Sequence, residues 1–333
     1  MHLVRWSCRA IPAAILLGSA CPVLADEPAQ RASSREIVDD VSSPDVVGDD
    51  TAPPPPDPLG PDARIERWCA PEIEALADDV CALTPKREAQ GPRTLVVFLH
   101  GVVKPDTSWQ WAQQRGVARA AEAHGFTVIM PRGRALIGPK GMETWWTWPT
   151  SATAQAKVED ELLAEWEGAR TFLEDRSTRP FERVWVFGFS NGAYYATSLA
   201  MRGRLARAPA ALHADGFAAF AGGSGASYLQ KAGRETKSRA PFFVAWGEKD
   251  PAHADQVSLA KMLRGLDWPS KSESAKRAGH AMTDKQVSDA VRFLDVARRS
   301  DEARATAPVH VEKRRAPNKS AAKTPSRSKK GAR

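Results

Sequence analysis

The stretch RVWVFGFSNGA, residues 183–193, combines an apolar run with a serine between two glycines. Residues 183–187 form a run without polar alternation, which is typical of a strand buried on both faces. Gly188, Ser190 and Gly192 follow directly, and a helix is expected to open near Ala193. In this context a serine between two glycines occupies a sharp turn that lifts its hydroxyl above the sheet edge. The stretch therefore predicts a nucleophilic Ser190, and the alternative is a plain glycine-rich turn.

Similar apolar runs and helical patterns alternate on both sides of this stretch. Further buried strands are predicted at residues 94–99, 126–130, 216–220 and 241–246. One helix is predicted from apolar residues spaced by four and three, namely Val158, Leu162, Trp166, Ala169 and Leu173. A last helix is predicted from Thr283, which forms a capping box with Gln286. This alternation predicts an α/β fold with a mostly parallel sheet and helices on both faces, although the segment before Thr94 does not show the first strands clearly.

An acid and a base follow Ser190 in chain order. Asp250 comes directly after the run 241–246, and His280 lies thirty residues later, just before the last helix. A serine hydroxyl is a weak nucleophile at neutral pH and needs a base in contact with it. We therefore expect His280 to accept the proton of Ser190, and Asp250 to hold the imidazole in the required tautomer.

Two other residues could fill these positions. Asp255 is an alternative acid, but we expect it to cap the helix that contains Leu259. His253 is an alternative base, but it lies too close to Asp250 in the sequence to come from the loop after the next strand. The preferred set therefore remains Ser190, Asp250 and His280.

A tetrahedral oxyanion needs backbone N–H donors near the nucleophile. The N–H of Asn191, directly after Ser190, is expected to be one donor. The second should come from the turn after Leu99, where we assign it to Val102. His100, in the same turn, is interpreted as a structural residue packed beneath it.

These segments together resemble the α/β-hydrolase superfamily, over about residues 93–297. Within it they are most similar to esterases related to polyhydroxybutyrate depolymerases, feruloyl esterases and dienelactone hydrolases. The resemblance implies a serine esterase that cleaves a small-molecule or polymeric ester through an acyl-enzyme. The triad alone would equally serve a peptidase or an acyltransferase. A different possibility is a non-catalytic envelope-binding protein on the same fold.

A tryptophan-rich stretch, WWTWP at residues 145–149, is similar to one in the depolymerase-like esterases. Trp145, Trp146 and Trp148 are therefore candidate substrate-binding residues. The alternative is that the indoles only pack a loop against the domain. No Cys/His cluster has the spacing of metal ligands, and no glycine-rich loop matches a phosphate or dinucleotide site, so neither a metal nor a cofactor is expected.

The first 25 residues have the pattern of a signal peptide, with Arg5 and Arg9 before a short apolar run and a small residue, Ala25, at the cleavage site. A secreted or periplasmic protein is expected, and lipidation at Cys21 is the alternative. In an oxidising compartment the remaining pair, Cys69 and Cys81, is expected to form a disulfide. Any helix that begins near Pro71 would then have to end before Cys81, and the alternative is two buried thiols.

Charge is unevenly distributed along the chain. Residues 26–63 hold ten acidic and two basic side chains and are rich in proline, which predicts a disordered linker. Residues 64–299 are predicted to form the single folded domain. The last segment, 300–333, is predicted to be a disordered basic tail, and it accounts for much of the formal charge of +7. In an exported protein such a tail could bind an anionic envelope polymer or lipid, and no nucleic-acid partner is expected.

Overall fold

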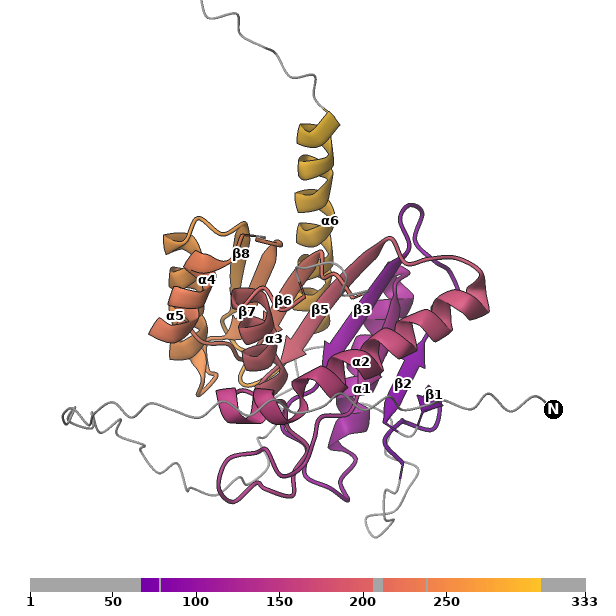
Figure 1. Cartoon of the computed structure of the whole chain (residues 1–333), viewed down its shortest axis with the longest axis horizontal. Helices are drawn as coiled ribbons and strands as arrows, with labels where there is room; N and C mark the ends of the chain where they lie inside the picture. The colour runs from indigo at the N-terminus through magenta and orange to yellow at the C-terminus, as the bar shows by residue number, and fades with distance from the viewer. Residues whose placement is uncertain (1–66, 78, 206–211, 238, 307–333) are drawn as a thin grey trace, which may run out of the picture. The chain divides into compact units, whose positions relative to one another are not determined.

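The computed structural model describes residues 67–77, 79–205, 212–237 and 239–306, with side chains as far as Ala297. The predicted signal peptide and linker, and the tail beyond residue 306, lie outside the described residues. The eight strands are β1 (Glu74–Ala77), β2 (Val80–Leu83), β3 (Thr94–Leu99), β4 (Thr127–Pro131), β5 (Arg183–Phe189), β6 (Gly216–Phe220), β7 (Phe242–Gly247) and β8 (Ser270–Ala275). The helices are α1 (Trp109–His124), α2 (Ala152–Ser177), α3 (Asn191–Met201), α4 (Ser227–Glu235), α5 (His253–Gly265) and α6 (Asp284–Thr306) (Figure 1).

All eight strands form one sheet in the order β1-β2-β4-β3-β5-β6-β7-β8. The pairs β1–β2 and β2–β4 are antiparallel, and the five pairs from β4–β3 to β7–β8 are parallel. This strand order with helical crossovers is the α/β-hydrolase fold, as the sequence predicts. The sequence did not reveal β1, β2 or β8, all of which lie toward the edges of the sheet.

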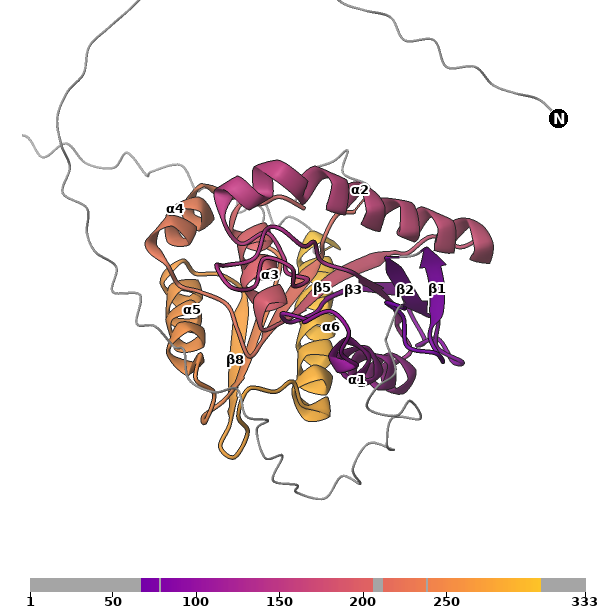
Figure 2. The ribbon, with the colours of Figure 1, turned by 90° about the horizontal axis from the view of Figure 1, so that it is seen from below.

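The central strands are apolar throughout because both of their faces are buried. In β3, Leu95, Val97 and Leu99 pack on the face covered by α2, α3 and α5. Val96 and Phe98 pack on the opposite face, which α1 and α6 cover (Figure 2). Successive side chains of a strand point to opposite faces of the sheet, so one continuous apolar run contributes to both hydrophobic cores.

Side-chain caps mark the starts of two helices. At the start of α2 the side chain of Ser151 accepts the N–H of Ala154, a cap that the sequence analysis did not identify. At the start of α6, the N–H of Thr283 donates to Gln286 Oε1 at 3.0 Å, and the N–H of Gln286 donates to Thr283 Oγ1 at 3.2 Å. This reciprocal pair is the predicted capping box. The same helix continues to Thr306, beyond the predicted domain end at residue 299, because Pro308 is the first strong helix breaker after it.

Cys69 and Cys81 form a disulfide with a Cα–Cα distance of 5.4 Å. No helix lies between them in the described residues. The chain instead turns after Ala70 and returns through β1 to β2, which contains Cys81. The side chain of Gln114 on α1 bonds both flanks of Cys69, accepting the N–H of Ala70 at 2.8 Å and donating to the carbonyl of Trp68 at 2.9 Å. The edge of the sheet is thereby fastened to α1.

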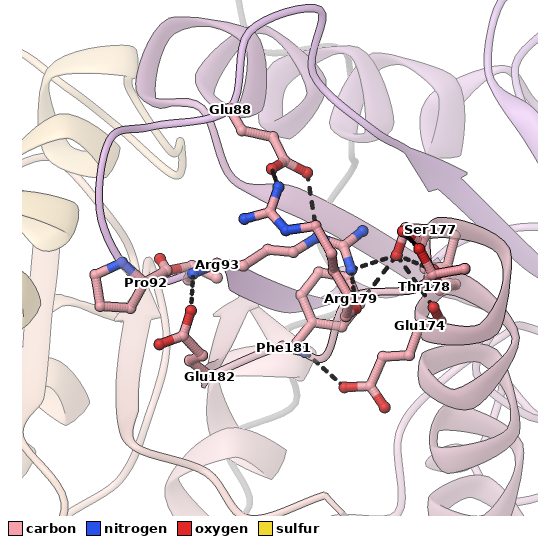
Figure 3. A network of polar contacts seen from close by, with 11 residues as sticks. Glu88, Pro92, Arg93, Glu174, Ser177, Thr178, Arg179, Phe181 and Glu182 are labelled. Atoms are coloured by element: carbon pink, nitrogen blue, oxygen red, sulfur yellow. Dashed lines mark hydrogen bonds and ion pairs between the residues drawn. The ribbon is translucent and has the colours of Figure 1, made fainter.

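Arg93, which is buried, links the segment before β3 to the segment between α2 and β5 (Figure 3). Arg93 Nε donates to Glu88 Oε1 at 3.1 Å, and its Nη1 donates to Ser177 Oγ at 2.6 Å. Its guanidinium lies 4.0 Å from the centre of the Phe181 ring. These contacts hold the segment before β3 against the end of α2. They lie at the amino ends of the parallel strands, whereas Ser190 lies at the carboxyl ends.

Among the described residues, none of the helices combines the length and apolar character that crossing a membrane requires.

Candidate active site

Ser190 occupies the sharp turn between β5 and α3. Its backbone has φ +51° and ψ −118°, a combination that L-residues rarely adopt. Such a conformation costs on the order of 1–3 kcal/mol and persists only where the surroundings enforce it. Here the N–H of Ser190 donates to the carbonyl of Phe220 at 2.9 Å, so the neighbouring strand β6 holds the turn.

The turn can form only because Gly192 has no side chain. A Cβ on Gly192 would lie 2.1 Å from the carbonyl oxygen of Leu99, at the end of β3. The N–H of Gly192 instead donates to the carbonyl of His100 at 3.1 Å. The start of α3 therefore sits directly against the turn after β3, and this contact explains the second glycine of the motif.

The loop that carries His280 lies against the end of β7. A Cβ on Gly247 would lie 2.1 Å from the carbonyl oxygen of Ala278 and 2.3 Å from that of Gly279. The N–H of Lys249 donates to the carbonyl of Ala278 at 3.1 Å. This close approach brings His280, at the end of one loop, to Asp250, in the turn after β7.

The structure brings the three predicted side chains into one hydrogen-bonded line. His280 Nε2 lies 2.8 Å from Ser190 Oγ, and His280 Nδ1 lies 3.0 Å from Asp250 Oδ1. With a proton on Nδ1 donated to the carboxylate, Nε2 is left to accept the hydroxyl proton. The ring of Phe189 lies 5.4 Å from the imidazole, centre to centre, and His280 is 40% exposed at the side chain. The imidazole is therefore within reach of an incoming substrate.

The carboxylate of Asp250 is buried and receives three hydrogen bonds. Besides His280, the N–H of Ala252 donates to Oδ1 at 2.8 Å, and Gln256 Nε2 donates to Oδ2 at 3.1 Å. Burial alone would raise the pKa of Asp250. The hydrogen bonds from His280, Ala252 and Gln256 outweigh it and hold the pKa below its ordinary value. The group is thus an anion at neutral pH, as an orienting acid must be.

The two alternative residues lie elsewhere. Asp255 accepts a hydrogen bond from Tyr194 Oη at 2.5 Å and lies in the first turn of α5. The expectation that its side chain caps that helix is wrong, because Ala252 occupies the N-cap position and Asp255 is already helical. His253, the first residue of α5, packs its ring 6.2 Å from that of Trp246. Neither side chain is hydrogen-bonded to Ser190, whose Oγ lies against His280.

The two predicted oxyanion donors flank Ser190. Asn191 begins α3, and Val102 lies in the turn after β3, one residue beyond Gly101, where a Cβ would lie 3.2 Å from Ser190 Cβ. Within the part of the chain that the structure describes, neither N–H has a hydrogen-bond partner. Both amides are therefore free to bind a developing oxyanion. The side chain of Asn191 faces a different group, with Oδ1 accepting the N–H of Trp148 at 2.7 Å.

His100 lies beneath the turn, as expected. Its side chain is buried between the rings of Trp68 and Trp148, each 4.9 Å away. Nδ1 contacts the carbonyl of Gly101, which can only accept, and Nε2 contacts the N–H of Gly133 at 2.9 Å, which can only donate. These partners require the neutral imidazole with its proton on Nδ1. Burial, the largest influence, lowers the pKa of His100 to about 4, although the hydrogen bond with Gly101 opposes this.

The tryptophan-rich stretch differs in part from expectation. Trp148 is 1% exposed, stacks on Tyr195 and donates from Nε1 to the carbonyl of His100 at 2.8 Å. It cannot line a substrate groove, because its side chain fills the core beneath the elbow. Trp146 is half-buried, with its ring 5.3 Å from Trp68, and its backbone pairs with Val103. Trp145 is also half-buried.

Several supporting residues escaped the sequence analysis. Gln113 on α1 accepts the N–H of Gly101 at 2.7 Å, and Gln256 on α5 bonds Asp250. Gln286, which the sequence predicted only as a capping residue, also donates to the carbonyl of Trp246 at 3.2 Å. A glutamine at an otherwise apolar helix position is a usable signal, because a buried amide needs a partner. Without the strand order, however, that partner could not be identified.

A cavity of about 350 Å³ lies at the amino edge of the sheet, lined among others by Thr94, His124, Arg183 and Asp295. None of the residues around Ser190 borders it, so this cavity is separate from the candidate active site. Among the described residues, no group of three or more His, Cys, Asp and Glu side chains is placed as metal ligands would be.

Comparisons with protein-family models and with curated proteins give no match. Similar solved structures include acyl-protein thioesterase 2 from Zea mays, with 16% identity over 65% of this chain and 97% of that chain and a TM-score of 0.47. Esterase B from Lactobacillus rhamnosis is 12% identical over 70% of this chain and 85% of that one, with a TM-score of 0.49. A Bacillus cereus carboxylesterase is 15% identical over 68% and 95%, with a TM-score of 0.42. At this level of similarity no property of those proteins is transferred to this chain.

Proposed function

We propose that this chain is a serine hydrolase that cleaves a carboxylic ester through an acyl-enzyme, with Ser190, His280 and Asp250 as its catalytic triad. One observation carries the proposal. The hydroxyl, the imidazole and a buried carboxylate lie in one hydrogen-bonded line, at 2.8 Å and 3.0 Å, on a strained strand-to-helix turn.

In the first half-reaction, Ser190 Oγ attacks the ester carbonyl carbon while its proton passes to His280 Nε2. The new imidazolium is stabilised by the anionic Asp250. The tetrahedral intermediate collapses, His280 returns the proton to the leaving alcohol oxygen, and the acyl group stays on Ser190. Water then repeats the sequence, with His280 as base, and releases the carboxylic acid.

The negative charge of each tetrahedral intermediate needs stabilisation that the triad does not supply. The N–H groups of Val102 and Asn191, which have no partner among the described residues, are the proposed donors. Asn191 also lies at the amino end of α3, where the helix dipole favours a negative charge. No metal and no cofactor takes part in this scheme.

Exposed apolar side chains support a substrate with an apolar group. Trp109, Leu136 and Tyr228 are 50%, 70% and 61% exposed. Trp109 begins α1 after β3, Leu136 follows β4, and Tyr228 lies in the first turn of α4 after β6. Because β3, β4, β5 and β6 are parallel, these segments leave the same edge of the sheet as Ser190. We propose that they contact the acyl or alcohol part of a small-molecule or polymeric ester.

We propose that the protein is secreted or periplasmic. The Cys69–Cys81 disulfide supports an oxidising environment, and the predicted signal peptide supports export. The basic tail is proposed to bind an anionic envelope polymer or lipid.

Chromogenic p-nitrophenyl esters from acetate to octanoate, together with a matched anilide, would test the activity. We expect turnover of the esters and labelling of Ser190 by a fluorophosphonate, with the anilide much slower. Labelling with turnover of the anilide alone would favour a peptidase. Absence of both labelling and turnover in the folded wild-type protein would contradict the proposal.

A further inference from the structure

Both backbone groups of Gly101 are held by side chains. Its N–H donates to Gln113 Oε1 at 2.7 Å, and its carbonyl accepts from His100 Nδ1. Two residues further on, the N–H and the carbonyl of Val103 bond the backbone of Trp146 at 3.1 Å and 2.9 Å. Val102 therefore lies between two fixed residues, while its own N–H has no partner in the described part of the chain.

These contacts determine where the Val102 N–H points. A trans peptide group is planar, and its C=O and N–H point in opposite directions. The carbonyl of Gly101 and the N–H of Val102 belong to the same peptide group. Since His100 draws that carbonyl to one side, the Val102 N–H is directed to the other. The turn itself lies against the nucleophile, since a Cβ on Gly101 would be 3.2 Å from Ser190 Cβ.

We propose that Gln113 is a positioning residue for the Val102 amide, a role that rests on the proposed function. By accepting the Gly101 N–H, Gln113 fixes the rotation of the preceding peptide group, and His100 fixes the following one. Without Gln113 the Gly101 N–H would be a buried donor with no partner, and the turn would rotate to satisfy it. The Val102 N–H would then move away from the position of the oxyanion, where donor placement within a few tenths of an ångström matters.

The surroundings of Gln113 favour this role over simple packing. The residue is buried, and its Nε2 has no partner among the described residues. If this position only filled space in the core, Leu or Met would give a more stable protein, because a buried amide with an unpaired Nε2 costs stability. The single bond to Gly101 is what distinguishes glutamine here.

The same helix supplies a matched control. Gln110 lies one turn earlier on α1 and is 1% exposed, and within the described residues neither of its amide atoms has a hydrogen-bond partner. Gln110→Met therefore removes a buried amide of the same size without removing a hydrogen bond to the turn. Gln113→Met does the same but also removes the acceptor.

The experiment compares both variants with wild type in kcat and KM for a p-nitrophenyl ester, and in the affinity of an aryl trifluoromethyl ketone, which forms a tetrahedral oxyanion on the serine. We expect Gln113→Met to lower kcat on the order of 10–100-fold, to leave KM within about twofold, and to weaken the ketone by a similar factor. Gln110→Met should leave all three near wild type.

A third variant separates positioning from folding. Gln113→Glu keeps an acceptor oxygen at the same reach, and burial should raise the pKa of the new carboxyl enough to keep it neutral. It should therefore retain more kcat than Gln113→Met. The proposal is overturned if Gln113→Met matches Gln110→Met in kcat, if its defect lies in KM alone, or if Gln113→Glu is as slow as Gln113→Met. If Gln113→Met does not fold, Gln113→Glu decides alone. A kcat and a ketone affinity near those of the wild type then support the proposal, and a loss of about tenfold in either overturns it. Failure of the esterase proposal is visible separately, as wild-type activity no higher than that of Ser190→Ala.

Discussion

The carbonyl oxygen of His100 accepts the backbone N–H of Gly192 at 3.1 Å, which joins the turn after β3 to the turn after β5. The two strands are neighbours in register, with Leu99 opposite Gly188, so their turns leave the sheet side by side. One of these turns carries Val102 and the other carries Ser190 and Asn191. The position of these two turns relative to one another is therefore set in part by a backbone hydrogen bond.

Replacing the nucleophile should abolish turnover without unfolding the protein. For Ser190→Ala we expect kcat to fall by about a thousand-fold or more, because only binding and the amide donors remain. The unfolding temperature should stay near that of the wild type, because Ala and Ser are similarly strained at this positive φ and the serine side chain does not cap α3. Retention of most activity, or continued fluorophosphonate labelling, would show that another residue is the nucleophile.

The two neighbouring acids should behave differently. Asp250→Asn is expected to lower kcat by about 10³–10⁴-fold, because the amide no longer stabilises the imidazolium and favours the wrong tautomer. Asp255→Asn, which changes only the partner of the Tyr194 hydroxyl, should have an effect of less than about tenfold. Steady-state kinetics of both variants on one ester decides the assignment. A larger loss for Asp255→Asn would make it the orienting acid.

Stability should depend on pH through His100. Its pKa in the folded protein is about 4, against an ordinary value of 6.5, so the unfolded chain binds more protons between these values. The contribution is complete above about pH 6.5 and is lost as the pH falls toward 4, and it amounts to about 3 kcal/mol. Urea unfolding at pH 7, 6, 5 and 4.5 would measure it. His100→Asn should flatten this part of the profile, whereas a variant of the exposed His213 to Asn should not. Equal slopes in all three proteins would contradict the assignment.

The disulfide should stabilise the fold rather than the chemistry. Cys69 and Cys81 are 12 residues apart, and closing a loop of this size contributes about 3 kcal/mol in the chain-entropy description. We expect the double variant Cys69→Ser with Cys81→Ser, or the reduced wild type, to lose about that much in urea unfolding. Activity of the folded fraction should be nearly unchanged. A loss below about 1 kcal/mol would show that the hairpin and Gln114 alone hold this edge.

Deleting residues 307–333 should separate binding from turnover. Hydrolysis of a soluble ester is expected to stay the same, because Ser190, Asp250 and His280 all lie upstream. Binding to vesicles that contain anionic lipid should weaken, and raised salt should mimic the deletion through screening. Cosedimentation at low and high salt measures this. Binding that survives both changes would point to lipidation at Cys21 or to the exposed apolar side chains.

The sequence predicted the centre of the sheet well and its edges poorly. The observed bounds of β3 and β6 match the predicted runs 94–99 and 216–220, because strands buried on both faces are apolar at nearly every position. β8 reads SKSESA and has no such run. It pairs only with β7, and its strand conformation comes from that pairing rather than from its own composition.

Composition could not separate the roles of the three tryptophans. Trp148 faces the core and Trp146 is half-exposed, although both belong to the same stretch. The direction of each indole depends on how the loop between β4 and α2 folds back, with Arg134 pairing with Thr147 and Val103 with Trp146. Each bridge joins the stretch to a residue outside it, Arg134 or Val103, and nothing within the stretch specifies that partner.

The sequence alone predicted the α/β fold and singled out Ser190, Asp250 and His280, whose side chains the structure places in contact. Each of these residues follows a local signal, a buried strand or the start of a helix, and parallel strands bring their carboxyl ends to one edge. The hydrogen bonds that fix the turn after β3 could be identified only from the tertiary structure. The partners of Gly101 are His100 beside it and Gln113 on a helix, and the N–H direction of Val102 depends on both. Hydrogen-bond direction between separate elements depends on how the elements pack, and local sequence does not encode that packing.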